Sequence, residues 1–465
     1  MIRQARWPLA LVLAAVMTAP AAGETLDEAW TRAYANNPSL LAQRARLRVI
    51  NERVSQALGN WRPTLNLETD TGKAVIVNRE LTDTDRRQQR DPTIASLSIV
   101  QPIYRGGRTL AQTRQAENQV RAERARLWSQ EQVIFLSTAT SFMDVLRDQA
   151  VLQLTLSNEQ RLTRQLEATQ DRFRVGEITR TDVFQAEARL ARATADRIDA
   201  EGGLEASRAT YRNVVGEVPG QLERPAVPLD LPGDLLEAID SASTNNPNVI
   251  SSEFDTEAAR DTIDLVRGEL LPVLQLEGRA TRSLETSSED SHVDNYEATL
   301  NLNVPLYQQG IVYSRLRAAK QNVIQNRRLL DQERRDAVEA ATRGWNDLQS
   351  ARAQVNSFQK QVEANEVALE GVEREASVGA RTVLDILDAE QELLDSQVSL
   401  VRAQRDELVA IYQLKTALGE LTARRLGLPV DLYDPEAHYN EVRDKWFGGS
   451  SSGQEDNGNA VPFDR

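Results

Sequence analysis

Two carboxylates stand three positions apart in the segment VGARTVLDILDAE, residues 378–390. On a helix, Asp385 and Asp388 would share one face. Rings of carboxylates around a pore favour cations and repel anions, so the pair is a candidate for ion selection if several chains surround one axis. Asp385 has a second interpretation, because Thr382 three residues earlier completes the pattern of a helix capping box. Capping does not explain Asp388, whose proximity to a like charge would cost an isolated helix a few tenths of a kcal/mol.

Enzyme chemistry finds no support in the sequence. The chain has no cysteine, which excludes disulfides and thiolate metal sites, and its two histidines are His292 and His438. It has no G-x-S-x-G, phosphate-binding loop or H-E-x-x-H motif. We therefore predict no catalytic residue, metal site or cofactor. The formal net charge of −14 argues against nucleic acid as a partner.

The chain that carries these residues is internally duplicated. Matching segments follow one another in the same order: NNPSL (36–40) with NNPNV (245–249), QPIYRGG (101–107) with VPLYQQG (304–310), and VGEITRTDV (175–183) with VGARTVLDI (378–386). Such matched order indicates two copies of one structural unit. We predict a first repeat at 24–229, a second repeat at 230–435, and a disordered tail at 436–465, whose end is rich in glycine, serine and asparagine.

Each repeat is predicted to contain two strands on either side of a polar loop. Apolar and polar residues alternate at 65–70, at 274–279 and again at 296–304, and the predicted loops are Asn78–Asp91 and Ser283–Asp294. Period two gives a strand one apolar and one polar face. A sheet in water can have this pattern, and a β-barrel in lipid around a wet lumen requires it.

Helices make up the remainder of each repeat. A first helix is interrupted at Pro38 or Pro247, and two long helices follow the strands. At 1.5 Å per residue, a helix of roughly 66 residues is ~100 Å long. Apolar residues recur seven apart in these helices, which predicts coiled-coil packing. The long helices are predicted at 107–173, 181–215, 310–376 and 382–418.

Residues 1–23 are predicted to be a secretory signal peptide. Arg3 and Arg6 precede the apolar stretch Leu9–Met17, and small residues lead to a cleavage site near Gly23. The stretch is too short to span a membrane as a helix, which needs roughly 20 residues, and no later segment reaches that length. We therefore expect membrane insertion only as a closed β-barrel.

Four strands per chain cannot close a barrel, because about eight is the practical minimum. The membrane interpretation therefore requires several copies, and three copies would supply twelve strands. Trp61, Tyr104 and Tyr307 stand where strand and helix meet. They are candidates for an interfacial aromatic belt, with packing at the junction as the alternative.

The repeated helix–strand–strand–helix order, the NNP segment, the QPIYRGG turn and the VG…T…D junction resemble the TolC family of outer-membrane channel-tunnels, over about residues 24–428. The resemblance implies a mainly α chain with a transmembrane β-barrel. Its homotrimer would join a 12-stranded β-barrel in the outer membrane to a long α-helical coiled-coil barrel extending into the periplasm. The function implied is export of proteins or small molecules, as the exit duct of a type I secretion or multidrug efflux system.

Partners also follow from the resemblance. They are outer-membrane lipid, a periplasmic adaptor (membrane fusion) protein, and an inner-membrane ABC or proton-driven transporter. In the family, the aspartates matching Asp385 and Asp388 form a selectivity ring at the periplasmic entrance. The chain has no cysteine to carry a lipid anchor, and in this respect it resembles the unlipidated branch of the family.

The resemblance implies a gate as well. Arg381 matches an arginine that keeps the entrance closed through contacts at the positions of Thr181 and Asp182. The alternative for Arg381 is a solvated side chain near a helix start. Ala376 stands where the family often has a tyrosine that helps to hold the gate, so the latch is expected to differ in this chain.

An alternative function is that of a soluble periplasmic coiled-coil adaptor or scaffold protein. Long helices with heptad spacing fit this alternative as well. The predicted strands distinguish the two functions. An adaptor has one helical hairpin and would not contain two copies of a strand, a polar loop and a second strand.

Overall fold

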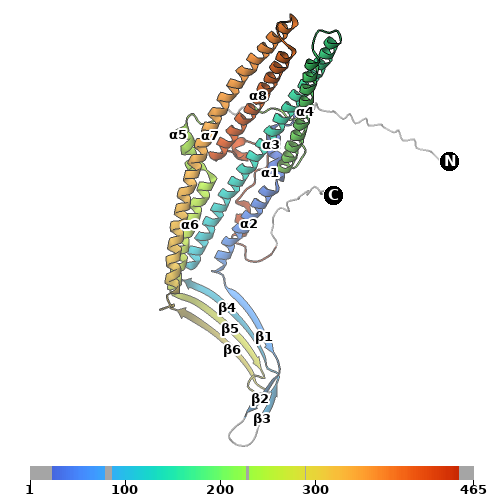
Figure 1. The fold of residues 1–465 in the computed structure, drawn as a ribbon. Coiled ribbons are helices and arrows are strands. Elements are labelled where there is room, and N and C mark those ends of the chain that lie inside the picture. Colours follow the sequence, from blue (N-terminus) through green and yellow to red (C-terminus); the bar gives the residue numbers. More distant parts are fainter. Residues whose placement is uncertain (1–22, 79–85, 227–229, 289, 450–465) are drawn as a thin grey trace, which may run out of the picture. The chain divides into compact units, whose positions relative to one another are not determined.

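The computed structural model describes residues 23–78, 86–226, 230–288 and 290–449 (Figure 1). The predicted signal peptide before Gly23 lies outside them, as does the end of the predicted tail. Contacts divide the chain into two compact units. The helical unit takes the described residues of Met1–Ala35, Ser137–Leu229 and Gln354–Leu408, and the sheet unit those of Asn36–Leu136, Asp230–Ala353 and Val409–Arg465. Both repeats contribute to each unit.

The sheet unit contains a four-stranded antiparallel sheet in the order β1-β4-β5-β6 (Figure 1). Its strands are β1 (Thr64–Thr71), β4 (Thr93–Arg105), β5 (Val273–Leu284) and β6 (His292–Asn303). Each repeat thus supplies two strands, and the repeats meet where β4 pairs with β5. The edge strands β1 and β6 are exposed along their whole length, because each has a neighbour on one side only.

A further two-stranded sheet occupies part of the first predicted polar loop. Strand β2 (Ala74–Asn78) pairs antiparallel with β3 (Arg86–Arg90). The prediction of a loop from residue 78 to residue 91 is therefore wrong for β3. The β-branched Val75, Ile76 and Val77 favour an extended backbone on the β2 side, and β3 is the partner that satisfies its hydrogen bonds. In the second repeat, β5 and β6 extend slightly into the predicted loop.

The long helices agree with the predicted ranges to within two residues. Helices α3 (Arg108–Arg174) and α7 (Ile311–Ser377) have 67 residues each. They are followed by α4 (Arg180–Val215) and α8 (Val383–Ala417). In the helical unit a buried cluster joins three of them through Leu162, Ala193, Val383 and Leu387. No helix in the described parts of the chain has the length and apolar character to cross a membrane.

The repeated Asn-Asn-Pro segments divide the first helix of each repeat, as predicted. The Asn37 side chain accepts hydrogen bonds from the backbone N–H groups of Ser39 and Leu40, at 3.0 and 3.4 Å. In the second repeat, Asn246 accepts one from Asn248 at 2.9 Å. Each proline occupies the first helical turn, where its missing N–H costs nothing. The helices so separated are α1 (Leu26–Asn36) and α2 (Pro38–Gly59), then α5 (Leu235–Asn245) and α6 (Pro247–Arg267), which a 3₁₀ turn, η1 (Gly268–Leu270), follows.

The second Asn-Asn-Pro segment also contacts the C-terminal end of α8. The Asn246 side chain donates to the carbonyl of Ala417 at 3.1 Å. Gly419 has φ +78°, and a Cβ atom there would lie 2.4 Å from the carbonyl oxygen of Asn245. Only glycine combines a left-handed backbone with so close an approach.

The tail prediction is wrong for the first residues beyond 436. After α9 (Ala423–Leu426), the chain forms α10 (Ala437–Val442). Tyr439 packs against a buried cluster that includes Val54 and Val120, and Arg124 forms an ion pair with Glu436 at 2.7 Å. These contacts hold a segment that precedes the glycine-, serine- and asparagine-rich end of the chain.

Candidate functional site

The two junctions between long helices have the same backbone geometry. Gly176 and Gly379 both have φ +81°. In the first junction the Gly176 N–H donates to the carbonyl of Phe173, and in the second the Gly379 N–H donates to that of Ala376, both at 3.0 Å. The glycine of each VG pair thus ends one helix in the left-handed conformation. The threonine three residues later, Thr179 or Thr382, stands immediately before the first residue of the next helix.

The capping box predicted around Asp385 is present. One carboxylate oxygen accepts hydrogen bonds from the backbone N–H and the hydroxyl of Thr382, both at 2.8 Å, and the Thr382 hydroxyl accepts from the Asp385 N–H at 3.3 Å. These bonds from Thr382 lower the pKa of Asp385 below its ordinary value. Asp385 is therefore ionised under physiological conditions. Thr179 and Asp182 form the equivalent box in the first repeat.

Asp388 forms an ion pair with Arg189 of α4 (Asp388 Oδ1 to Arg189 Nη2). Arg189 was not singled out from the sequence. Its one sequence signal is its position two helical turns beyond Asp182, on the same side of α4. The pair places a positive charge directly beside Asp388, whereas the nearest described guanidinium to Asp385, that of Arg381, lies farther away at 4.0 Å.

Arg381 makes its described contacts within its own junction. Its Nε lies 2.9 Å from Glu375 Oε2, and its Nη1 lies 4.0 Å from Asp385 Oδ1. Within one chain, the described contacts do not bring Arg381 to Thr181 or Asp182. Thr181 is exposed, and Asp182 is engaged by Thr179 at 2.8 Å. The five predicted site residues thus lie at two similar junctions without direct contact between the junctions.

A buried carboxylate lies just beyond Asp388 on the same helix. Glu390 is 6 % exposed, and its Oε2 has no hydrogen-bond partner among the described residues. Burial raises the pKa of Glu390, and Arg161 opposes that effect. Sequence reasoning missed this residue, because the alternation of acidic and apolar residues does not reveal which carboxylate faces the neighbouring helices.

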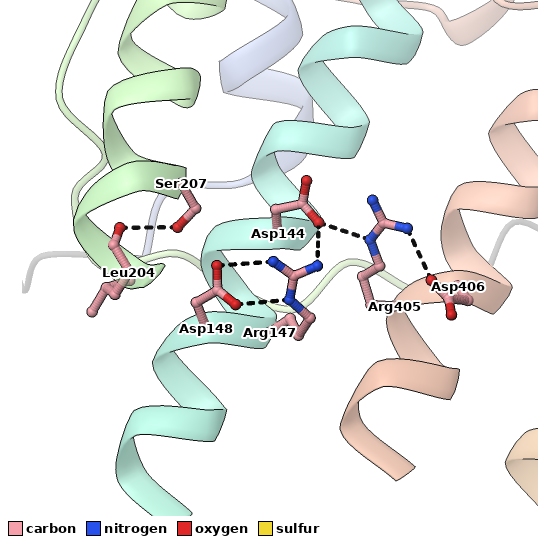
Figure 2. A network of polar contacts seen from close by, with 7 residues as sticks. All are labelled: Asp144, Arg147, Asp148, Leu204, Ser207, Arg405 and Asp406. Atoms are coloured by element: carbon pink, nitrogen blue, oxygen red, sulfur yellow. Dashed lines mark hydrogen bonds and ion pairs between the residues drawn. The ribbon is translucent and has the colours of Figure 1, made fainter. Parts of the chain in front are cut away.

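Farther along the same helices, a polar network fixes α8 against α3 (Figure 2). Asp144 accepts from Arg147 at 2.9 Å and from Arg405 at 2.8 Å. Asp148 binds Arg147 in a two-bond arrangement, at 2.7 and 2.9 Å, and Asp406 accepts from Arg405 at 2.9 Å. These half-buried ion pairs fix the position of α8, the helix that carries Asp385 and Asp388, relative to α3. A groove of about 620 Å³ between α3, α4 and α8 lies beside the network.

The three candidate belt aromatics lie at the boundary between helices and sheet in the sheet unit. Trp61, Tyr104 and Tyr307 all expose a large part of their rings. The carbonyl of Trp61 accepts a hydrogen bond from the Gln101 side chain at 2.9 Å, which ties the start of β1 to β4. Exposed rings at this boundary fit either a lipid interface or contact with another copy of the chain.

Comparison with known proteins adds a family to this geometry. The outer membrane efflux protein family matches residues 30–217 and again residues 238–420. The chain is 34% identical over 441 residues to the outer membrane efflux protein BepC of Brucella suis, covering 94% of this chain and 95% of that protein. It is 26% identical to the outer membrane protein TolC of Escherichia coli, over 87% of this chain and 84% of that protein.

Solved structures share the fold at lower sequence identity. The Campylobacter jejuni CmeC outer membrane channel superposes with a TM-score of 0.77 at 14% identity. The match covers 96% of this chain and 97% of that one. The arrangement of long helices with a small antiparallel sheet is therefore one that an outer membrane channel uses.

Proposed function

The chain belongs to the outer membrane efflux protein family, and from this premise we propose that three copies form the exit duct of an export system. The protein is an outer-membrane channel and not an enzyme. Proteins, small molecules or both would leave the cell through it, driven by a type I secretion or multidrug efflux machine. The alternative of a soluble adaptor does not agree with the family matched by both halves of the chain.

One observation carries the proposed trimer, namely the two unpaired edges of the sheet. Strands β1 and β6 are the outer strands of an antiparallel sheet, and they run in opposite directions. Strand β6 of one copy can therefore pair antiparallel with β1 of the next. Unpaired edges are a liability in water and are not tolerated in lipid. Three copies would close a sheet of twelve strands, above the practical minimum of about eight.

The proposed selectivity ring follows from the same symmetry. Three copies would gather six carboxylates from Asp385 and Asp388 around the axis. The Thr382 cap lowers the pKa of Asp385, and each carboxylate has an arginine near it, Arg381 at 4.0 Å from Asp385 and Arg189 in direct contact with Asp388. A ring of this kind attracts cations and repels anions.

The proposed gate is a contact between copies. Arg381 uses Nε and Nη1 for Glu375 and Asp385 of its own junction, and half of its side chain is exposed. We place the polar groups of Thr181 and Asp182 of a neighbouring helix pair against it in the closed state. With Ala376 in place of a larger polar residue, the latch would depend on Arg381 more heavily.

The partners proposed are a periplasmic adaptor and an inner-membrane transporter. Several curated relatives are named for export or secretion, among them the alkaline protease secretion protein AprF of Pseudomonas aeruginosa, and in such a system we assign the supply of energy to another protein. The turns at Gly176 and Gly379 are the ends of the helical unit on which such a partner would act.

Purification and electrical recording test the proposal. We expect the mature protein in the outer-membrane fraction, a trimeric mass in detergent by native mass spectrometry, and cation-preferring channels in planar bilayers. Recovery of a monomer in the detergent-free periplasmic fraction would contradict it. Gene deletion followed by comparison of secreted proteins and drug sensitivity would identify the cargo.

A further inference from the structure

The last described residues return to the point where helix and sheet meet. Arg62, between α2 and β1, donates a hydrogen bond from Nη1 to the carbonyl of Lys445 at 2.7 Å. Its guanidinium carbon lies 4.8 Å from the ring centre of Trp446. Tyr439 in α10 packs onto α2, so the segment is held at two points.

Two aromatic rings at this position face solvent. Trp446 is 58 % exposed and Phe447 is 87 % exposed. Their ring centres are 6.5 Å apart, with an angle of 45° between the rings. A fixed backbone that presents two adjacent large rings to water is typical of a contact surface rather than of a solvated tail.

The neighbourhood of the pair has the composition of a membrane interface. Trp61 precedes Arg62 and is itself 41 % exposed. Strand β1 begins two residues later and exposes Leu65 and Leu67. The rings therefore lie at the boundary between polar helices and a strand with exposed leucines on one face. Tryptophan concentrates at such boundaries because its ring is apolar and its N–H is polar.

We propose that Trp446 and Phe447 insert into the phospholipid headgroup region and anchor the chain outside its sheet. The anchor rests on the proposed function, because it requires that the sheet lie in the membrane. Arg62 orders the anchor before contact with lipid, since it binds both the backbone of Lys445 and the Trp446 ring. Arg62 and Lys445 also place positive charge near the phosphate level.

Site-directed spin labelling can test the anchor directly, because the chain contains no cysteine. Phe447→Cys would be labelled and reconstituted into vesicles of phosphatidylethanolamine and phosphatidylglycerol. Leu67→Cys on β1 provides the lipid-exposed reference, and Glu177→Cys in the turn between α3 and α4 the water-exposed one. Collision of each label with oxygen, which prefers lipid, and with a water-soluble nickel chelate would be measured.

We expect the ratio of oxygen to nickel accessibility at Phe447 to lie between the two references and several-fold above that at Glu177. A water-like ratio at Phe447, with a lipid-like ratio at Leu67, would overturn the anchor alone. A water-like ratio at Leu67 would instead count against the membrane placement of the sheet, and so against the proposed function. An immobilised label with low access to both reagents would overturn the anchor in favour of contact with a second copy.

A second variant tests the role of Arg62. In Arg62→Ala the label at residue 447 should become more mobile and lose most of its preference for oxygen. Arg53→Ala is the matched control, because Arg53 lies on α2 and donates to Gln119 at 3.0 Å without contact to this segment. An unchanged label in Arg62→Ala would show that Arg62 does not hold the anchor.

Discussion

Asp388 in the second repeat pairs with Arg189 in the first. The two residues come from helices α8 and α4, which occupy equivalent places in the two repeats, yet their charges are opposite. The two helix junctions are therefore similar in backbone geometry, and an ion pair joins the helices that follow them, α4 and α8. The pairing also means that the two aspartates of the proposed ring differ in environment, which leads to the first two predictions.

Replacement of both carboxylates by amides should weaken cation selectivity. Asp385→Asn with Asp388→Asn removes the charge but keeps an oxygen that can accept from Thr382. We expect the cation-to-anion permeability ratio, measured from reversal potentials in planar bilayers, to move towards one, and block by multivalent cations to weaken. Asp395→Asn is the control, because this aspartate lies on the same helix and bonds to Gln391 at 2.8 Å. An unchanged ratio in the double variant would refute the ring.

Removal of Arg189 should act in the opposite direction. Arg189→Ala leaves Asp388 without its positive neighbour, so the negative potential of the ring and the preference for cations should increase. The change should shrink at high ionic strength, because salt screens exposed charges. Arg192→Ala serves as the control, since Arg192 is mostly exposed and lies 3.8 Å from Asp196. Equal selectivity of the two variants would exclude Asp388 from the pore.

Loss of the Arg381 guanidinium should open the proposed gate. We expect Arg381→Ser to raise single-channel conductance several-fold, because the serine reaches neither its own junction nor a neighbouring copy. Arg374→Ser removes another exposed arginine, which pairs with Glu370 on the same helix, and should leave conductance unchanged. Similar conductance in both variants would show that Arg381 is only a solvated residue near a helix start.

The buried Glu390 should make stability depend on pH. Burial raises the pKa of its carboxyl above the ordinary value of 4.5, so the folded chain binds this proton more tightly than the unfolded chain. Its contribution to stability is thus fully present below the unfolded pKa and is lost as pH rises through the folded pKa. Glu390→Gln should gain thermal stability over the natural chain as pH rises from 4.5 to neutrality. Glu392→Gln, at an exposed position, should show no such trend in circular dichroism melting curves.

Gly419 should tolerate no side chain. In Gly419→Ala a left-handed backbone and a contact of 2.4 Å with the Asn245 carbonyl should destabilise the fold by about 1–3 kcal/mol. Gly202→Ala is the matched control, because Gly202 lies inside α4 with open space around it. There the change should stabilise by about 0.5–1 kcal/mol. Comparable melting temperatures for the two variants would contradict the assigned role of Gly419.

The features predicted successfully are those that local sequence encodes. Long stretches without proline and with few glycines predicted the long helices. The Asn-Asn-Pro segments predicted the breaks before Pro38 and Pro247, because capping involves neighbours a few residues apart. The box of Thr382 and Asp385 was predictable for the same reason. The alternation of apolar and polar residues predicted one pair of strands in each repeat.

The features missed depend on contacts between distant segments. The Asp388–Arg189 pair requires the relative register of α4 and α8, which the polar network around Asp144 helps to set. Glu390 and Asp388 are both acidic residues on one helix, and only packing distinguishes the buried one from the exposed one. The ordered α10 likewise depends on contacts with α2 and α3, which its six residues do not reveal.

The edges of the sheet have a genetic consequence. Strand β1 belongs to the first repeat and β6 to the second, so each contact between copies would join two different surfaces. A chain with a damaged β6 and an intact β1 would still enter a growing ring and then prevent its closure. Such an allele should be dominant over the normal one, whereas a chain damaged at both edges should be recessive.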